Sequence, residues 1–92
     1  MRLLVTIDLK AADLAAFEAY EATVLPLLAR HGARLEMRLR AIDDSSETHL
    51  LFFPNTESHQ NYLADPARAA ARPQWGRSGA NATGVEVREL RA

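Results

Sequence analysis

The 92-residue sequence predicts a single α+β domain spanning residues 1–92, with four strands in one antiparallel sheet and helices between them. Two segments, 2–9 and 47–54, are apolar almost throughout, which is typical of strands in the middle of a sheet. Two others, 33–42 and 82–90, alternate between apolar and polar side chains and carry charges, which favours edge strands. Stretches with helical periodicity connect the first strand to the second and the third to the fourth.

The composition excludes several classes of function. The 11 basic and 12 acidic residues give a net charge of −1, which argues against a nucleic-acid-binding protein. The absence of cysteine excludes thiol catalysis, disulfides and cysteine-ligated zinc. Asp8 and Lys10 interrupt the apolar start of the chain too early for an export signal or a membrane span. We therefore expect a soluble, cytoplasmic protein with neither a nucleic-acid nor a membrane partner.

The first helix is predicted over residues 13–31, where apolar side chains recur every three or four positions. Asp13 is suited to cap its start, and Gly32 is suited to end it in a left-handed conformation. Pro26 lies inside this segment and removes a backbone hydrogen bond, so we expect the helix to bend there.

The second strand is expected to turn into the third through residues 43–46, a polar cluster of the length used in hairpins. The third strand stops at Pro54, which cannot donate a ladder hydrogen bond. Either Asn55 or Thr56 can cap the second helix that follows.

The segment after the second helix is predicted to be a short helical turn followed by a loop. Asp65 and Pro66 favour a new helix start, because aspartate caps and proline suits the first turn. Pro73 is expected to end the alanine-rich turn that follows. Residues 74–80, which include Trp75 and two glycines, are expected to form a loop before the last strand.

The element order β-α-β-β-α-β, with two central and two edge strands, predicts the strand order 4-1-3-2 of a ferredoxin-like fold. Both helices then cover one face of the sheet. The side chains expected to face them from the edge strands are Leu35, Met37, Leu39, Val85 and Val87. The opposite face is expected to carry Arg2, Arg34, Glu36, Arg38, Arg40, Glu86 and Arg88. It is joined from the third strand by either His49, Leu51 and Phe53 or Thr48, Leu50 and Phe52.

This opposite face mixes charges with leucine and phenylalanine, so it is too apolar to leave in water and too charged to be a dry core. Packing two copies of it together would cover it, with arginines and glutamates pairing across the join. We therefore expect the chain to form a homodimer with itself through this face.

Two pairs of segments resemble a known family. Residues 20–28 and 31–33 look like the first helix and second-strand entry of dimeric α/β-barrel proteins, and residues 53–57 and 62–66 look like the third-strand exit and second helix. More narrowly, they resemble a small uncharacterised bacterial family related to antibiotic-biosynthesis-type monooxygenases. The superfamily implies a ferredoxin-like fold, a face-to-face dimer, and members that are cofactor-free quinone-forming monooxygenases, haem-degrading enzymes, lactone isomerases or proteins without known activity. The catalytic motifs of those branches have no clear match here, so the resemblance implies architecture rather than chemistry.

The arginines of the second strand are the first candidate site. Together with Arg2 and Arg88, Arg34, Arg38 and Arg40 could hold a carboxylate or phosphate, because guanidinium groups bind these anions in a bidentate way. The alternative is that their charges keep an edge strand soluble or form salt bridges between subunits.

A ligand pocket between sheet and helices is the second candidate. His59 and Tyr62 lie one helical turn apart, where a histidine could shuttle protons and a tyrosine could orient a ligand. Trp75 either closes this pocket or plugs the core, and His49 either projects into it or is a hydrogen-bonded structural histidine. Arg40 completes the set of expected ligand-binding residues.

Two functions remain open from the sequence. The first is a protein that binds or transforms a small aromatic or carbonyl compound without a cofactor, and the second is a non-catalytic homodimer whose charged face serves only association. The three histidines are too scattered to predict a metal site.

Overall fold

The computed structural model describes all 92 residues as a ferredoxin-like α+β fold. The elements are β1 (Arg2–Asp8), α1 (Leu14–Val24), a 3-10 helix η1 (Leu25–His31), β2 (Arg34–Arg40), β3 (Ser46–Phe52), α2 (Thr56–Leu63), α3 (Pro66–Ala70), α4 (Arg72–Ser78) and β4 (Asn81–Val87). No helix is long and apolar enough to cross a membrane.

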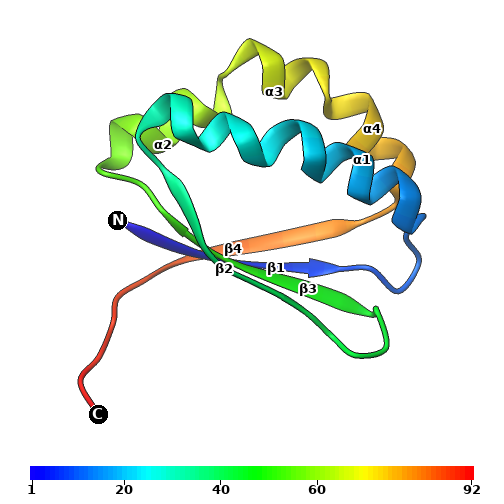
Figure 1. Cartoon of the computed structure of the whole chain (residues 1–92), viewed down its shortest axis with the longest axis horizontal. Helices are drawn as coiled ribbons and strands as arrows, with labels where there is room; N and C mark the ends of the chain where they lie inside the picture. Colours follow the sequence, from blue (N-terminus) through cyan, green and yellow to red (C-terminus); the bar gives the residue numbers. More distant parts are fainter.

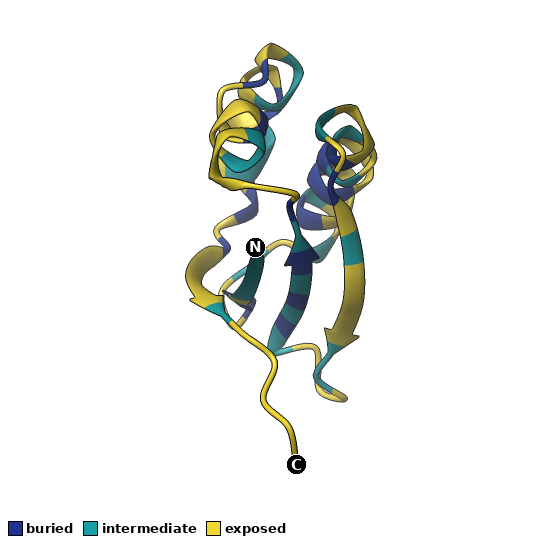
Figure 2. Ribbon diagram, turned by 90° about the vertical axis from the view of Figure 1, so that its left-hand side faces the viewer, coloured by how far each residue is buried: buried dark blue, intermediate teal, exposed yellow.

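The sheet is antiparallel with the order β2-β3-β1-β4, which confirms the predicted strand order. All helices lie on one face of it, and the other face is uncovered (Figure 1). The edge strands β2 and β4 are exposed along most of their length, whereas β3 alternates between buried and half-buried residues (Figure 2). The face between the helices and the sheet therefore holds the core.

The predicted first helix begins and ends where expected but changes type inside. The Asp13 side chain accepts a hydrogen bond from the backbone N–H of Ala16 and caps α1. The α-helical pattern stops at Val24, and Pro26 lies in the first turn of η1. Gly32 ends η1 with a φ of 67°, a left-handed conformation that glycine adopts at little cost.

Asp65 connects the start of α3 to the end of η1. It caps α3 by accepting from the backbone N–H of Ala67 at 2.9 Å, as predicted. Its carboxylate also lies 2.8 Å from Nε2 of His31 and 3.3 Å from Nη1 of Arg30. The hydrogen bond to His31, followed by that from Ala67, holds the pKa of Asp65 below its usual value.

The expected loop at residues 74–80 is wrong, because Pro73 begins a helix rather than ending one. It lies in the first turn of α4, where its missing N–H costs nothing. The helix continues to Ser78, and Gly79 ends it with a φ of 73°. Trp75 is thereby placed on a helix and packs against Tyr20 of α1, with ring centroids 5.1 Å apart.

A β-bulge changes which side chains of β2 face the helices. Leu35 pairs with Leu51, but the next pair is Met37 with Leu50, so Glu36 is an extra residue. Strand side chains alternate with a period of two. Each side chain after Glu36 therefore points to the face opposite to the one that unbroken alternation from Leu35 would give it. Arg38 and Arg40, expected on the uncovered face, therefore point to the helices.

The same bulge corrects the prediction for the apolar side chains of β2. Leu35 faces the helices as expected, but Met37 and Leu39 lie on the uncovered face, where they are 50% and 57% exposed. Arg34 and Glu36 remain on the uncovered face as predicted, and Glu36 accepts from Nε of Arg2 at 2.7 Å.

The prediction for β4 is also corrected. Val85 pairs with Leu4 and Val87 with Arg2, so both valines lie on the uncovered face. Glu86 pairs with Leu3 and belongs to the helix-covered face. The register with β1, which the hydrophobic pattern of an edge strand does not reveal, sets these directions.

The uncovered face is therefore more apolar than predicted, and the open choice on β3 resolves to Thr48, Leu50 and Phe52 on this face. Its apolar side chains are Leu4, Met37, Leu39, Leu50, Phe52, Val85 and Val87. At one end the guanidinium carbons of Arg34 and Arg2 lie 4.1 and 5.5 Å from the ring centroid of Phe52. Arg88 follows the end of β4, in a segment that leaves the sheet (Figure 1).

Candidate functional site

A cavity of about 480 Å³ lies between the helices and the sheet, which is within the range of small-molecule sites. Of its 18 lining residues 12 are hydrophobic, so its walls suit an apolar ligand with a few polar groups. The sheet contributes Leu3, Val5 and Leu51 to these walls, and α1 contributes Val24.

Aromatic rings form much of the helical side of the cavity. The ring of Tyr20, on α1, packs against the ring of Trp75, on α4, and both line the cavity. At the other end, the ring of Phe53 lies 4.8 Å from His59 and 5.6 Å from Tyr62. Such rings can hold a flat ligand by stacking and edge contacts.

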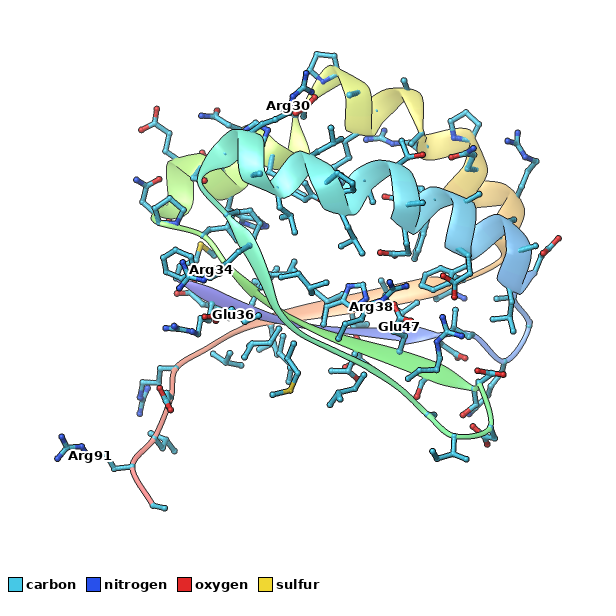
Figure 3. The ribbon with its side chains drawn as sticks, in the orientation of Figure 1. Arg30, Arg34, Glu36, Arg38, Glu47 and Arg91 are labelled. Atoms are coloured by element: carbon cyan, nitrogen blue, oxygen red, sulfur yellow. The ribbon has the colours of Figure 1, made fainter.

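A charged group of side chains is buried beside the cavity, and Glu47 is its centre. Both of its oxygens accept hydrogen bonds: Oε1 from Nε of Arg40 at 2.8 Å and Oε2 from Nε of Arg38 at 3.0 Å. Nε2 of His49 lies 2.5 Å from Oε2 and also donates to it. Figure 3 shows Arg38 and Glu47 together between the sheet and α1.

The charge of Glu47 is stable despite its burial. The side chain is 2% exposed, and burial alone would raise the pKa of its carboxyl. The hydrogen bonds from His49, Arg38 and Arg40 outweigh that effect and hold the pKa below its usual value. Glu47 is therefore an anion fixed by three donors.

Glu21 of α1 is the opposite case. It is 4% exposed and lines the cavity, and its carboxyl oxygen lies within 4.8 Å of the ligating atoms of both Glu47 and His49. None of the influences on its pKa is a hydrogen bond. Burial, followed by the repulsion of Glu47, raises the pKa of Glu21 to about 7. Near neutral pH this carboxyl can both give and take a proton.

The spacing of Glu21, Glu47 and His49 alone would also suit a cation. However, Glu47 is already bound by two guanidinium groups, whose positive charges repel a metal ion. We call Glu21, Glu47, His49, Arg38 and Arg40 the buried charge cluster, because its two carboxyls and its histidine are buried, whereas its two arginines are partly exposed.

Arg68 gives the cavity a positive charge. Its Nε is buried without a hydrogen-bond partner, and its guanidinium carbon lies 5.1 Å from the ring centroid of Tyr62. Arg72 lines the same cavity. A guanidinium group at the wall of a mostly apolar cavity can bind an anionic oxygen of a ligand.

Four of the five side chains expected to bind a ligand line the cavity: His49, His59, Tyr62 and Trp75. Burial, followed by the charge of Arg68, lowers the pKa of His59, whereas burial raises the pKa of the Tyr62 hydroxyl. The fifth, Arg40, points to the helices but is bound to Glu47, Glu18 and Asp44.

The arginines of β2 have carboxylate partners within the chain, so they present no free anion site. Arg38 and Arg40 bind Glu47 and Glu18. Arg34 pairs with Glu36 at 3.4 Å. These salt bridges form within one chain, and not between subunits as the alternative expected.

Sequence reasoning missed Glu21, Glu47 and Arg68 as parts of the site. Glu21 carries a usable signal, because it is a charged residue on the apolar stripe of α1. Glu47 lies in the polar first half of β3, and only the bulge in β2 brings its arginine partners to it. Arg68 lies in an alanine-rich turn without any distinguishing pattern.

No protein-family model and no curated protein sequence matches the chain. Solved structures do. One is SnoaB, a cofactor-independent oxygenase from Streptomyces nogalater, at 18% identity and a TM-score of 0.69 over 97% of this chain and 94% of that one.

A protein from Nitrosomonas europaea described as an antibiotic biosynthesis monooxygenase matches at 12% identity and a TM-score of 0.69, over 99% and 100% of the two chains. An uncharacterised NIPSNAP domain protein from Burkholderia xenovorans matches at 13% identity and 0.65, over 100% and 99%. At these identities the likeness shows a shared fold. The chain therefore has the ferredoxin-like fold of antibiotic-biosynthesis-type monooxygenases, as the resemblance predicted.

Proposed function

We propose that the cavity binds or transforms a small aromatic or carbonyl compound through protein side chains, without a cofactor. The observation that carries this proposal is a cavity of about 480 Å³ whose walls are mostly apolar and aromatic and which Arg68 also lines. A flat compound with one anionic or carbonyl oxygen could bind the guanidinium of Arg68 and stack among the rings. The description of SnoaB as a cofactor-independent oxygenase supports a site of this kind on the same fold.

We further propose that the protein is a cytoplasmic homodimer joined through the uncovered face of the sheet. Met37, Leu39 and Val85 are each at least half exposed there, on a face with no helix over it. A second copy related by a two-fold axis would cover the same apolar side chains in both chains. Arg2, Arg34 and Glu36 at one end can pair with their copies at the rim.

A second observation favours a second copy as the occupant. The segment 88–92 leaves the sheet and extends on the side of the uncovered face (Figure 1). It carries Leu90, which is 74% exposed. In a face-to-face dimer this segment would lie beside the partner sheet, where Leu90 could be buried.

The ligand proposal is tested by thermal-shift measurements with quinones, aromatic acids and acyl compounds. A ligand at a hundred times its dissociation constant raises stability by about 2.7 kcal/mol. Trp75 is the only tryptophan and lines the cavity, so its fluorescence gives an independent binding signal. Arg68→Met keeps the aliphatic stem and removes the guanidinium, so it should weaken aromatic acids much more than neutral quinones. Flat melting curves and unchanged fluorescence for every compound would leave the non-catalytic homodimer as the better description.

A further inference from the structure

Glu21 is poorly explained as a structural residue. Its carboxyl is buried beside a fixed anion, Glu47, and receives no hydrogen bond. A glutamine or leucine of similar size would avoid the cost of burying this group. A residue whose position opposes stability and which lines a cavity is a candidate for a functional role.

The groups around Glu21 favour proton exchange over permanent charge. Glu47 and His49 lie beside it on β3, and Glu18 lies on its own helix. Arg38 and Arg40 of β2 also act on it, but their hydrogen bonds go to Glu47 and Glu18. From the remaining helices, Arg68 and Arg72 line the same cavity.

Glu21 and Arg68 act on the same part of the cavity. Arg68 lowers the pKa of both the Tyr20 and the Tyr62 hydroxyl, and Glu21 raises the pKa of both. Both tyrosines therefore lie within electrostatic reach of a carboxyl and a guanidinium that have no bond to each other. A ligand lying along these rings could meet the guanidinium with an anionic group and the carboxyl with an acidic proton.

We propose that Glu21 is the acid–base residue of this cavity, and that it moves a proton on an enolisable aromatic carbonyl compound whose carboxylate is held by Arg68. The proposal rests on the proposed ligand site and adds the chemistry and the substrate class. It requires a ligand with three parts: a ring, an anionic group, and a C–H bond next to a carbonyl.

The reaction is a keto–enol isomerisation. The Glu21 carboxylate takes the proton from the carbon next to the carbonyl, and the electron pair of that C–H bond forms the C=C bond of an enolate. The protonated Glu21 then gives the same proton to the enolate oxygen, which yields the enol and restores the carboxylate. No electron is transferred and no other reactant is consumed. The carboxylate beside the enolate remains bound to Arg68, which favours the developing negative charge.

Phenylpyruvate is a suitable probe because it has all three parts. Its enol is followed by ultraviolet absorbance, and the rate in buffer alone is subtracted. We expect the protein to accelerate enolisation, and the rate to rise with pH through about 7 as Glu21 ionises. Glu21→Gln should lower the rate about 100-fold or more, which is typical of losing a general base.

The matched control is Glu57→Gln, which makes the same change at an exposed position on α2 and should leave the rate unchanged. Glu21→Gln should still bind phenylpyruvate, as measured by thermal shift and Trp75 fluorescence, because Arg68 is intact. A metal effect is tested in the same assay, since a rate that depends on added Mg²⁺ or Zn²⁺ and falls with chelator would contradict a protein-only mechanism.

The outcomes separate the two proposals. If phenylpyruvate binds and Arg68→Met abolishes binding, but Glu21→Gln reacts as fast as the natural protein, the acid–base role of Glu21 is overturned and the ligand site stands. If other compounds bind but phenylpyruvate does not, the substrate class is overturned. If no compound binds, the ligand site itself is wrong and the acid–base role falls with it.

Discussion

Arg38 of β2 pairs in register with His49 of β3, on the face of the sheet that the helices cover. From there its guanidinium reaches Glu47, two residues from His49 along β3. The pairing depends on the bulge at Glu36, because Arg38 would otherwise point to the uncovered face. The buried charge cluster is thus assembled from two neighbouring strands and α1, and its members should depend on one another energetically.

Glu47→Gln should destabilise the fold by about 2 kcal/mol at pH 7, because it removes a buried carboxylate that accepts hydrogen bonds from two partly exposed arginines and from His49. Urea unfolding measures the loss, and Glu57→Gln serves as the exposed control. Because the folded state lowers the pKa of Glu47, its contribution is present above the unfolded value and is lost as the pH falls. The difference between variant and natural protein should therefore shrink below about pH 4.5, the ordinary value for glutamate. A difference that stays constant down to pH 3 would contradict the charged assignment.

Glu21 should have the opposite effect on stability. Its carboxyl binds a proton more tightly in the folded than in the unfolded state, so stability should fall as the pH rises from 4.5 to about 7. Above pH 7 the accumulated loss is about 3 kcal/mol, since one pKa unit corresponds to 1.36 kcal/mol. Glu21→Gln should remove this loss and exceed the natural protein in stability at pH 8. Denaturant melts at several pH values measure both curves, and parallel curves would show that the carboxyl is already ionised in the fold at low pH.

Leu39→Glu should convert the proposed homodimer to a monomer, because it places a charge on the apolar, uncovered face of the sheet. Val85→Glu on the opposite edge should act in the same way. Ile42→Glu is the control, since that side chain is fully exposed in the turn after β2. Sedimentation velocity at micromolar concentration distinguishes the states. A natural protein that is itself monomeric under these conditions would refute the face-to-face arrangement.

Two glycines of one segment should respond differently to alanine. Gly79 has a φ of 73°, and a Cβ there would lie 3.1 Å from the carbonyl oxygen of Ala11, so Gly79→Ala should cost about 1 to 2 kcal/mol. Gly76 lies within α4 with open space where its Cβ would be, so Gly76→Ala should stabilise by about 0.5 to 1 kcal/mol. Thermal melts of the two variants test the helical assignment of α4. A destabilised Gly76→Ala would favour the loop expected from the sequence.

The strand order, the helix caps and the end of η1 were predictable because each follows from a local signal. Asp13, Asn55 and Asp65 cap helices as expected, and Gly32 adopts the left-handed conformation. Pro73 was misread because the same residue can end one helix or begin the next, and only the neighbouring fold decides.

The directions of the edge-strand side chains could not be predicted. Hydrophobicity places Met37 and Leu39 under the helices, yet both are exposed, because the bulge and an apolar outer face reverse the usual rule. The sequence likewise brought His49, His59, Tyr62 and Trp75 into one hypothesis but left Glu21 out. Buried carboxyls are rare, so a helix stripe is ordinarily interpreted as apolar packing even when it contains one.

The bulge at Glu36 has a consequence for how such proteins diverge. Deleting that single codon would remove the extra residue and leave Met37, Arg38, Leu39 and Arg40 with the same partners on β3 and on the same faces. The change would fall on the uncovered face, where Arg2 and Arg34 would lose the carboxylate that they share. Relatives that are one residue shorter at this point should therefore keep the interior charges and differ in the charge of the exterior.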